Sequence, residues 1–86
     1  MKRMQTIQTG DLIKPFADKE YFFLEDKIDE PEDVWIEIEW KDIPGVVLGV
    51  DDFDPPREYK RVKVVVNGML GWTYSDYVHV VSFEYF

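Results

Sequence analysis

The chain has 86 residues, a length that predicts one domain with a modest core. Hydrophobic residues make up 45% of it and aromatic residues 16%, a composition that excludes intrinsic disorder. The lack of cysteine excludes disulfides and thiolate metal sites, and no apolar run has the length of a membrane helix. The formal net charge of −8 opposes binding to nucleic-acid phosphates and favours basic partners.

Residues 1–9 are mostly polar and are expected to be flexible. The first strand is predicted over residues 10–15, with Leu12 able to face the core. Residues 17–33 are predicted as a long acidic and aromatic loop, in which an apolar patch, 21–24, stands among many carboxylates. Because long structureless loops are unusual in compact domains, we expect this patch to fold back as a short strand or turn.

Residues 34–40 alternate in a way typical of a strand. A helix that begins at Pro31 is the alternative, because proline suits the first helical turn. The β-branched content and the period of two favour the strand. On one face we expect Val34, Ile36, Ile38 and Trp40, and on the other Trp35, Glu37 and Glu39. A further strand is predicted over the almost continuously apolar residues 45–51, followed by a proline-containing loop.

The strongest structural signal is a β-hairpin with strands at 59–66 and 69–73. Asn67 and Gly68 lie between them, and both tolerate the positive φ that a two-residue type I′ turn needs. The period of two places Lys60, Val62, Val64 and Val66 on the core face of the first strand. Arg61 and Lys63 then face water or a neighbouring acidic strand. A helical turn is predicted at 74–77 and a last strand at 78–83.

The stretch from Gly71 to Val78, which reads GWTYSDYV, resembles the end of SH3 domains. There the pattern is Gly, two apolar residues, Pro, Ser, Asn, Tyr and Val; Tyr74 stands at the position of the proline and Asp76 at that of the asparagine. With the blocks GDLI at 10–13 and GVVLGV at 45–50, the chain is similar to small uncharacterised SH3-like proteins of tailed bacteriophages. The resemblance implies an all-β, SH3-like antiparallel barrel of five or six strands with one 3-10 turn before the last strand.

The resemblance also implies a binding site. It places Trp72, Tyr74 and Tyr77 beside Tyr21 and Phe23 of the first loop, with the acidic residues Glu25 and Asp26 at their flank. In SH3 domains this combination of aromatic groove and acidic loop recognises Pro-rich segments that carry a basic residue. The expected partner-binding residues are therefore Tyr21, Phe23, Glu25, Asp26, Trp72, Tyr74 and Tyr77.

Reactive groups give weaker signals. Glu37 and Glu39 would lie about 7 Å apart on one strand face, which suggests glycoside hydrolysis, but ion pairs with Arg61 and Lys63 are the better interpretation. Asp51, Asp52 and Asp54 lack the other ligands of a calcium loop. His79 has no nucleophile signature nearby, so a strand-face histidine with a local hydrogen bond is expected. We therefore expect no enzyme activity, no cofactor and no metal.

The surplus of aromatic residues is the best functional lead, because tyrosine and tryptophan form binding patches as well as cores. The rings concerned are Tyr21, Phe23, Trp35, Trp40, Trp72, Tyr74 and Tyr77. They favour a non-catalytic protein–protein interaction module, phage-encoded as an accessory or virion-associated protein, in the host cytoplasm or the virion. Alternatives are an acidic nucleic-acid mimic, or a small nucleic-acid-binding barrel that uses Arg57, Lys60, Arg61 and Lys63. The aromatic tail 83–86 packs on its own barrel or inserts into a neighbour.

Overall fold

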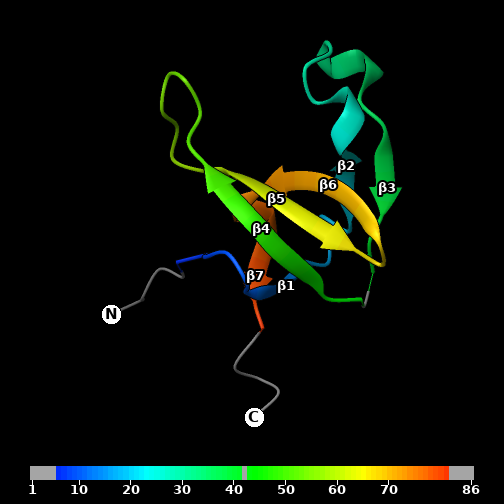
Figure 1. Cartoon of the computed structure of the whole chain (residues 1–86), viewed down its shortest axis with the longest axis vertical. Coiled ribbons are helices and arrows are strands. Elements are labelled where there is room, and N and C mark those ends of the chain that lie inside the picture. The colour runs from blue at the N-terminus through cyan, green and yellow to red at the C-terminus, as the bar shows by residue number, and fades with distance from the viewer. Residues whose placement is uncertain (1–5, 42, 82–86) are drawn as a thin grey trace.

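The computed structural model describes residues 6–41 and 43–81 and shows an all-β architecture (Figure 1). Seven antiparallel strands form one sheet in the order β3-β2-β6-β5-β4-β1-β7, which curls into a half-barrel. No helix in the described part of the chain is long and apolar enough to cross a membrane. The strands are β1 (Leu12–Pro15), β2 (Tyr21–Leu24), β3 (Glu37–Glu39), β4 (Gly45–Asp51), β5 (Arg61–Val66), β6 (Met69–Tyr74) and β7 (Val78–Val80). Three short 3-10 turns are η1 (Glu25–Lys27), η2 (Glu32–Val34) and η3 (Ser75–Tyr77).

The predicted hairpin is confirmed as β5 and β6. Its turn residues Asn67 and Gly68 have φ values of 51° and 81°, as a type I′ turn requires. The two-residue turn sets the register, so that Val66 faces Met69 and Arg61 faces Tyr74 across the pair. The alternation on β5 is also confirmed, because its valines at 62, 64 and 66 are buried in the core.

The main core fills the inside of the curl. Its members come mostly from β1, β4, β5 and β7, and are Ile13, Phe22, Trp40, Val47, Val62, Val64, Val66, Val78 and Val80. The rings of Phe22 and Trp40 meet edge to face with centroids 5.7 Å apart. In β1 the deeply buried side chain is Ile13 rather than Leu12, which is only half-buried. Ile7 packs against this core, although residues 1–9 were expected to be flexible; residues 1–5 lie outside the described part.

The prediction of a continuous strand over 34–40 is wrong, because only its second half, β3, is a strand. Pro31 precedes the 3-10 turn η2, which is closed by hydrogen bonds from the Val34 N–H to the Pro31 carbonyl and from the Trp35 N–H to the Glu32 carbonyl. Residues 34–36 therefore alternate between apolar side chains without belonging to the sheet, so this alternation does not place one set of side chains in the core. Val34 and Ile36 remain 46% and 41% exposed.

The expectation that the apolar patch 21–24 folds back as a short strand or turn is confirmed, because these residues form β2. The rest of the predicted loop 17–33 contains η1 and the start of η2. β2 pairs with β3 on one side and with β6 on the other, and this brings the count to seven strands rather than five or six. Both faces of β2 are covered: Phe22 points into the main core and Phe23 packs against Trp72. A strand buried on both faces does not alternate, which hides it from a period-two search.

The expected ion pairs between Glu37 and Glu39 on one strand and Arg61 and Lys63 on another are wrong. β2 and β6 separate β3 from β5 in the sheet. Lys63 instead forms an ion pair of 3.6 Å with Glu25 of η1, and Glu39 pairs with Lys41 at 3.5 Å. The last strand ends at Val80 within the described residues, and the aromatic tail 83–86 lies outside them.

Candidate binding cleft

A cleft of about 450 Å³ opens at one end of the sheet. Two segments rise from that end: residues 25–36, here the β2–β3 excursion, and residues 52–60, here the β4–β5 loop (Figure 1). Rings dominate the lining, and charged groups stand among them. The lining residues are Tyr21, Phe23, Glu32, Trp35, Glu37, Arg57, Tyr59, Tyr74, Asp76 and Tyr77. We call this set the aromatic cleft.

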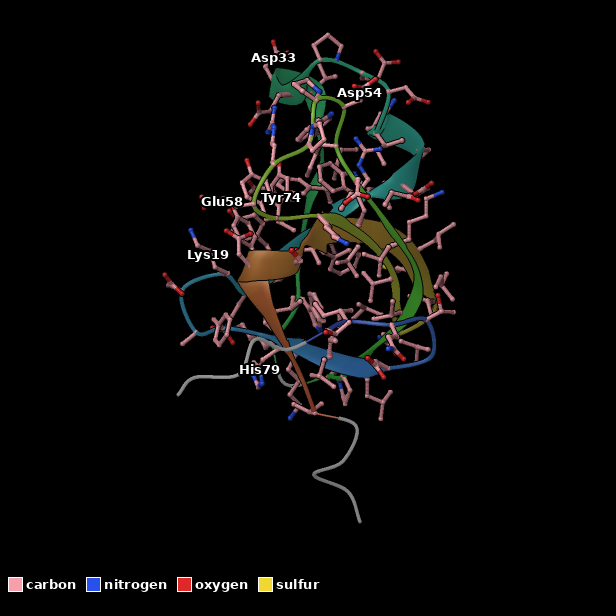
Figure 2. The ribbon with its side chains drawn as sticks, turned by 90° about the vertical axis from the view of Figure 1, so that its left-hand side faces the viewer. Lys19, Asp33, Asp54, Glu58, Tyr74 and His79 are labelled. Atoms are coloured by element: carbon pink, nitrogen blue, oxygen red, sulfur yellow. The ribbon has the colours of Figure 1, made fainter. Side chains whose placement is uncertain are left out.

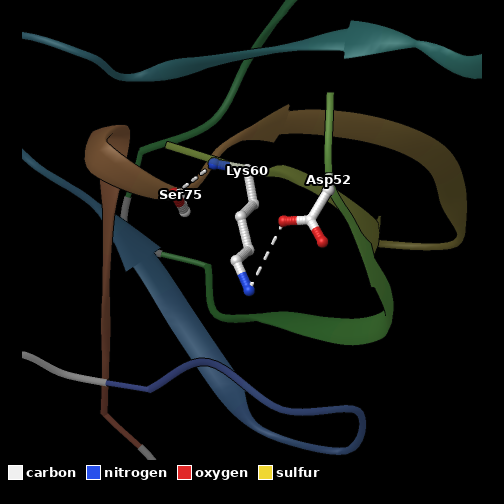
Figure 3. A network of polar contacts seen from close by, with 3 residues as sticks. All are labelled: Asp52, Lys60 and Ser75. Carbon is white, nitrogen blue, oxygen red and sulfur yellow. Dashed lines mark hydrogen bonds and ion pairs between the residues drawn. The ribbon is translucent and has the colours of Figure 1, made fainter. Parts of the chain in front are cut away.

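A small polar network fixes the β4–β5 loop against η3 (Figure 3). The Lys60 N–H donates to Ser75 Oγ over 2.8 Å, and the Ser75 N–H donates back to the Lys60 carbonyl over 2.8 Å. Lys60 Nζ also forms an ion pair of 3.6 Å with Asp52 at the start of the loop. These contacts hold Tyr59 and Tyr74, the neighbours of Lys60 and Ser75 in the chain, side by side with ring centroids 5.3 Å apart.

A second layer of packed rings forms the base of the cleft, on the face of β6 opposite the main core. Trp72 is fully buried at its centre. Its ring lies 4.8 Å from that of Phe23, 4.8 Å from that of Trp35 and 5.2 Å from that of Tyr74, measured between centroids. The pairs of Trp72 with Trp35 and with Tyr74 are edge-to-face, and such pairs add to the stabilisation that burial alone provides. The base of the cleft is thus a layer of packed rings, while loop residues complete its walls.

Tyr74 lines the cleft between rings of the β4–β5 loop and of η3, and Figure 2 shows its position below the loop that carries Asp54. Its ring contacts Tyr59 on one side, and on the other Tyr77, at a centroid distance of 4.9 Å. Burial raises the pKa of Tyr74, and the negative charge of Glu32 raises it further, while Arg57 acts in the opposite sense. The Tyr74 hydroxyl therefore stays protonated at neutral pH, as a hydrogen-bond donor at the cleft surface.

The raised pKa of the Tyr77 hydroxyl can be used to test the structure of the cleft. Burial first, and then a hydrogen bond with Tyr21, raise the pKa of Tyr77 to about 12. Because this pKa lies above the value of 10.0 for an ordinary tyrosine, the folded chain holds its proton more tightly, and stability should fall as the pH rises from 10 toward 12. In an ultraviolet titration we expect the Tyr77→Phe protein to lose the component that titrates near pH 12, while Tyr74, whose pKa is also raised, still titrates late in both proteins. A component near pH 12 of unchanged amplitude in this variant would contradict the assignment.

The two walls of the cleft carry opposite charges. Glu32 and Glu37 belong to the side of the β2–β3 excursion, and Asp76 lies in η3 below them. None of these three carboxylates forms an ion pair with another residue in 6–41 or 43–81. Arg57 faces them from the β4–β5 loop, where its guanidinium lies 4.8 Å from the centre of the Phe53 ring. The acidic side is therefore open to a cation from another molecule.

The structure brings together most of the residues that the sequence predicted for the site. Tyr21, Phe23, Tyr74 and Tyr77 line the cleft, and Trp72 supports it from below without being exposed. Glu25 and Asp26, which were expected at the flank of the rings, do not line the cleft. Both residues belong to η1, which packs against β6. There Glu25 pairs with Lys63 on the neighbouring strand β5.

Sequence reasoning missed several of the lining residues, although one signal for them was present. The hairpin register places Arg61 opposite Tyr74, so Tyr59, two residues before Arg61, had to emerge near Tyr74 on the same face. Trp35 was expected on one strand face with Glu37 and was counted among the surplus rings, but it was not assigned to the site. Asp76 lies in the predicted turn 74–77 but was not assigned to the site either, while Glu32 and Arg57 come from segments whose course no sequence pattern fixed. The loop ring Phe53, 5.9 Å from Tyr74 between centroids, was missed too.

The other candidate groups do not converge with the cleft, except for Glu37, which lines it. No group of three or more potential metal ligands forms within the described residues, and Asp52 is paired with Lys60. His79 stacks on Phe16 with ring centroids 5.0 Å apart, which differs from the expected local hydrogen bond. It lies at the far end of the molecule from Tyr74 (Figure 2).

The basic residues expected to form one nucleic-acid-binding cluster are spread over several contacts. Lys60 pairs with Asp52 and Lys63 with Glu25. Arg57 and Arg61 lie against rings, with Arg61 5.2 Å from the centre of Trp72 and 5.5 Å from that of Phe53. This arrangement leaves no continuous cationic track for a phosphate backbone among the described residues.

Comparisons with protein-family models, with curated proteins and with solved structures find no match for this chain. Its chemistry must therefore be judged from the cleft itself. The lining combines six rings, which offer apolar area with polar tips, and three carboxylates, which offer negative charge. Such groups bind and orient an extended apolar and cationic ligand.

Proposed function

We propose that the chain is a non-catalytic protein-interaction module that binds a proline-rich segment with a basic residue in the aromatic cleft. The observation that carries this proposal is one open cleft of about 450 Å³ whose walls and base are both lined by aromatic rings. Proline rings pack well on flat aromatic faces, and a polyproline II segment loses little entropy on binding because it is already extended. The half-exposed tyrosines supply hydroxyl donors for its carbonyl groups.

The carboxylates of the cleft account for the basic residue of the partner. Glu32, Glu37 and Asp76 stand at one side of the rings and have no ion-pair partner among the described residues. A lysine or arginine side chain that lies across the rings would meet both π faces and negative charge. The net charge of −8 adds a long-range attraction for a basic segment.

An SH3-like fold and a phage setting are part of the same proposal. Three features support the SH3-like assignment: the β5–β6 hairpin, the 3-10 turn η3 directly before the last strand, and the hairpin of β2 and β3 that packs against β6. The resemblance of the blocks 10–13 and 45–50 to small SH3-like phage proteins is the reason for proposing a phage-encoded accessory or virion-associated role. On this proposal the protein acts in the host cytoplasm or in the virion.

A peptide titration tests the binding proposal. The probe is a synthetic peptide with two Pro-x-x-Pro repeats and one flanking arginine, here the Arg peptide, and its affinity is measured by calorimetry. Tyr74→Ala removes the ring at the centre of the cleft and should weaken binding about 30-fold, the effect of a hot-spot residue. Glu37→Gln should weaken it by a smaller factor, because it removes one of the three carboxylates.

Glu39→Gln is the matched control for Glu37→Gln. Glu39 lies two residues further along the same strand, exposed and paired with Lys41, and does not line the cleft. Its substitution changes net charge equally and should leave the affinity unchanged. Circular dichroism checks that each variant keeps its fold. Equal losses in the Glu37 and Glu39 variants, or full affinity in a folded Tyr74→Ala protein, would show that the cleft is not the binding site.

A second candidate function is charge mimicry of a nucleic acid. It is favoured by the exposed carboxylates of Asp26, Asp29, Glu30, Glu32 and Asp33 along the β2–β3 excursion. These could stand in for phosphates in the basic groove of a nucleic-acid-binding enzyme. Binding by mimicry should weaken steeply with ionic strength, whereas a contact anchored on rings should not. Binding of the Gln form of the peptide, whose arginine is replaced by glutamine, should therefore depend only weakly on salt if the rings anchor it, and this result would favour the interaction module.

A further inference from the structure

The β4–β5 loop places a cation of the chain itself at one end of the aromatic cleft. The Arg57 guanidinium lies 4.8 Å from the centre of the Phe53 ring and 5.8 Å from that of Tyr59. Arg57 Nη1 also donates a hydrogen bond of 3.0 Å to the Tyr59 hydroxyl. Arg57 is an exposed residue, so this position is not forced on it by burial. The rings of Phe53 and Tyr59 thus form a cation subsite that is already filled.

The guanidinium is held by rings and not by the carboxylates across the cleft. Arg57 lines the same cleft as Glu32, Glu37 and Asp76, but forms an ion pair with no described residue. A second guanidinium, that of Arg61, lies 5.5 Å from the centre of the Phe53 ring. Because Phe53 already has two cations near it, a third cation could use this subsite only if Arg57 left it.

We propose that Arg57 is an internal ligand of the cleft, which a basic side chain of the partner displaces from the Phe53–Tyr59 subsite. This inference rests on the proposed function, and adds to it the place where the partner's cation binds and a residue that limits its affinity. Displacement costs little free energy because the side chain of Arg57 is exposed, and its guanidinium becomes fully hydrated when it leaves the two rings. The negative charge of Glu32, Glu37 and Asp76, which line the same cleft, attracts the partner's cation toward it.

The test compares two peptides and three proteins. The peptides are the Arg peptide and the same sequence with glutamine in place of its arginine, here the Gln peptide. The proteins are the unmodified chain, Arg57→Gln and Lys41→Gln; Lys41 is exposed and outside the cleft, so this control changes the net charge equally. We expect Arg57→Gln to bind the Arg peptide about two- to fivefold more tightly, the range of one exposed cation–π contact. The Gln peptide and Lys41→Gln should show no gain.

A nuclear magnetic resonance measurement follows the displacement directly. The guanidinium of Arg57 lies close to two rings, so in the free protein ring currents should move the resonances of the Arg57 protons nearest to it, those of Nε–H and of the adjoining δ-methylene group, from their usual arginine positions. The Arg peptide should return them to the usual position, and the Gln peptide should leave them shifted. Resonances that stay shifted when the Arg peptide is bound would overturn the proposal.

The affinities separate this inference from the function on which it rests. Weaker binding of the Arg peptide by Arg57→Gln would make Arg57 a direct contact of the ligand, and would overturn displacement. Unchanged affinity would overturn it as well, and in both cases the cleft would still be a peptide site. If none of the three proteins binds either peptide, the proposed function fails and the inference with it.

Discussion

Replacement of Gly71 by alanine is expected to lower the free energy of unfolding by about 3 kcal/mol, the upper part of the range for overpacking. Gly71 is buried in β6 opposite Leu24 of β2. A Cβ atom there would lie 2.6 Å from Phe22 Cε2 and 2.6 Å from the Phe23 carbonyl oxygen. The second of these is backbone, so β2 has to move away from β6 to accommodate even one methyl group. Urea denaturation followed by circular dichroism measures the loss.

Gly49→Ala is the control for this prediction. Gly49 also lies within a strand, β4, but a Cβ atom at this position would have no other heavy atom within 4 Å. Its substitution should change the stability by less than about 1 kcal/mol. Equal stability of the Gly71→Ala and Gly49→Ala proteins would mean that β2 does not pack on β6 as closely as the structure shows.

Trp72→Ala is expected to have the largest effect on stability, a loss of about 3–5 kcal/mol. The side chain is fully buried and supports Phe23, Trp35 and Tyr74. A domain of this size has roughly 5–10 kcal/mol of total stability, so the variant should be close to unfolding at room temperature. Where it remains folded, it should also lose affinity for the Arg peptide, because the floor of the cleft has collapsed.

Trp72→Phe tests how much of the stability comes from the aromatic ring and how much from the indole N–H group. The indole N–H is buried and finds no acceptor among the described residues, so its removal also relieves an unpaired donor. We expect this variant to lose less stability than Trp72→Ala, because the phenyl ring keeps part of the packing and leaves a smaller cavity. A Trp72→Phe protein as unstable as Trp72→Ala would show that the phenyl ring does not replace the contacts of the indole with Phe23, Trp35 and Tyr74.

The hairpin could be predicted from the sequence because its information is local. Asn67 and Gly68 define the turn, and the valines before them define the buried face. The apolar patch 21–24 was expected as a short strand or turn, but the pairing of β2 and the extent of β3 could not be predicted, because they depend on what each strand packs against. The four apolar residues of β2 are covered on both faces, while alternating residues such as Val34 and Ile36 stay exposed beyond the reach of the sheet.

The candidate site was predictable where the resemblance and the hairpin register determine it. Tyr74 and Tyr77 follow from the turn before the last strand, and Tyr21 and Phe23 follow from the segment that packs against it. The charged side of the cleft was not predictable. Many carboxylates lie between residues 18 and 39, and only the path of the β2–β3 excursion decides that Glu32 and Glu37 line the cleft while Glu25 pairs with Lys63.

The most direct test of the account is a map of backbone amide shifts in nuclear magnetic resonance spectra during titration with the Arg peptide. The account predicts that the shifts concentrate on the cleft residues Phe23, Trp35, Tyr59, Tyr74 and Tyr77. Lys14 and His79, on β1 and β7 away from the cleft, should not respond. Shifts centred on the exposed apolar side chains of Val46, Leu48 and Leu70, or no shifts at all, would contradict it.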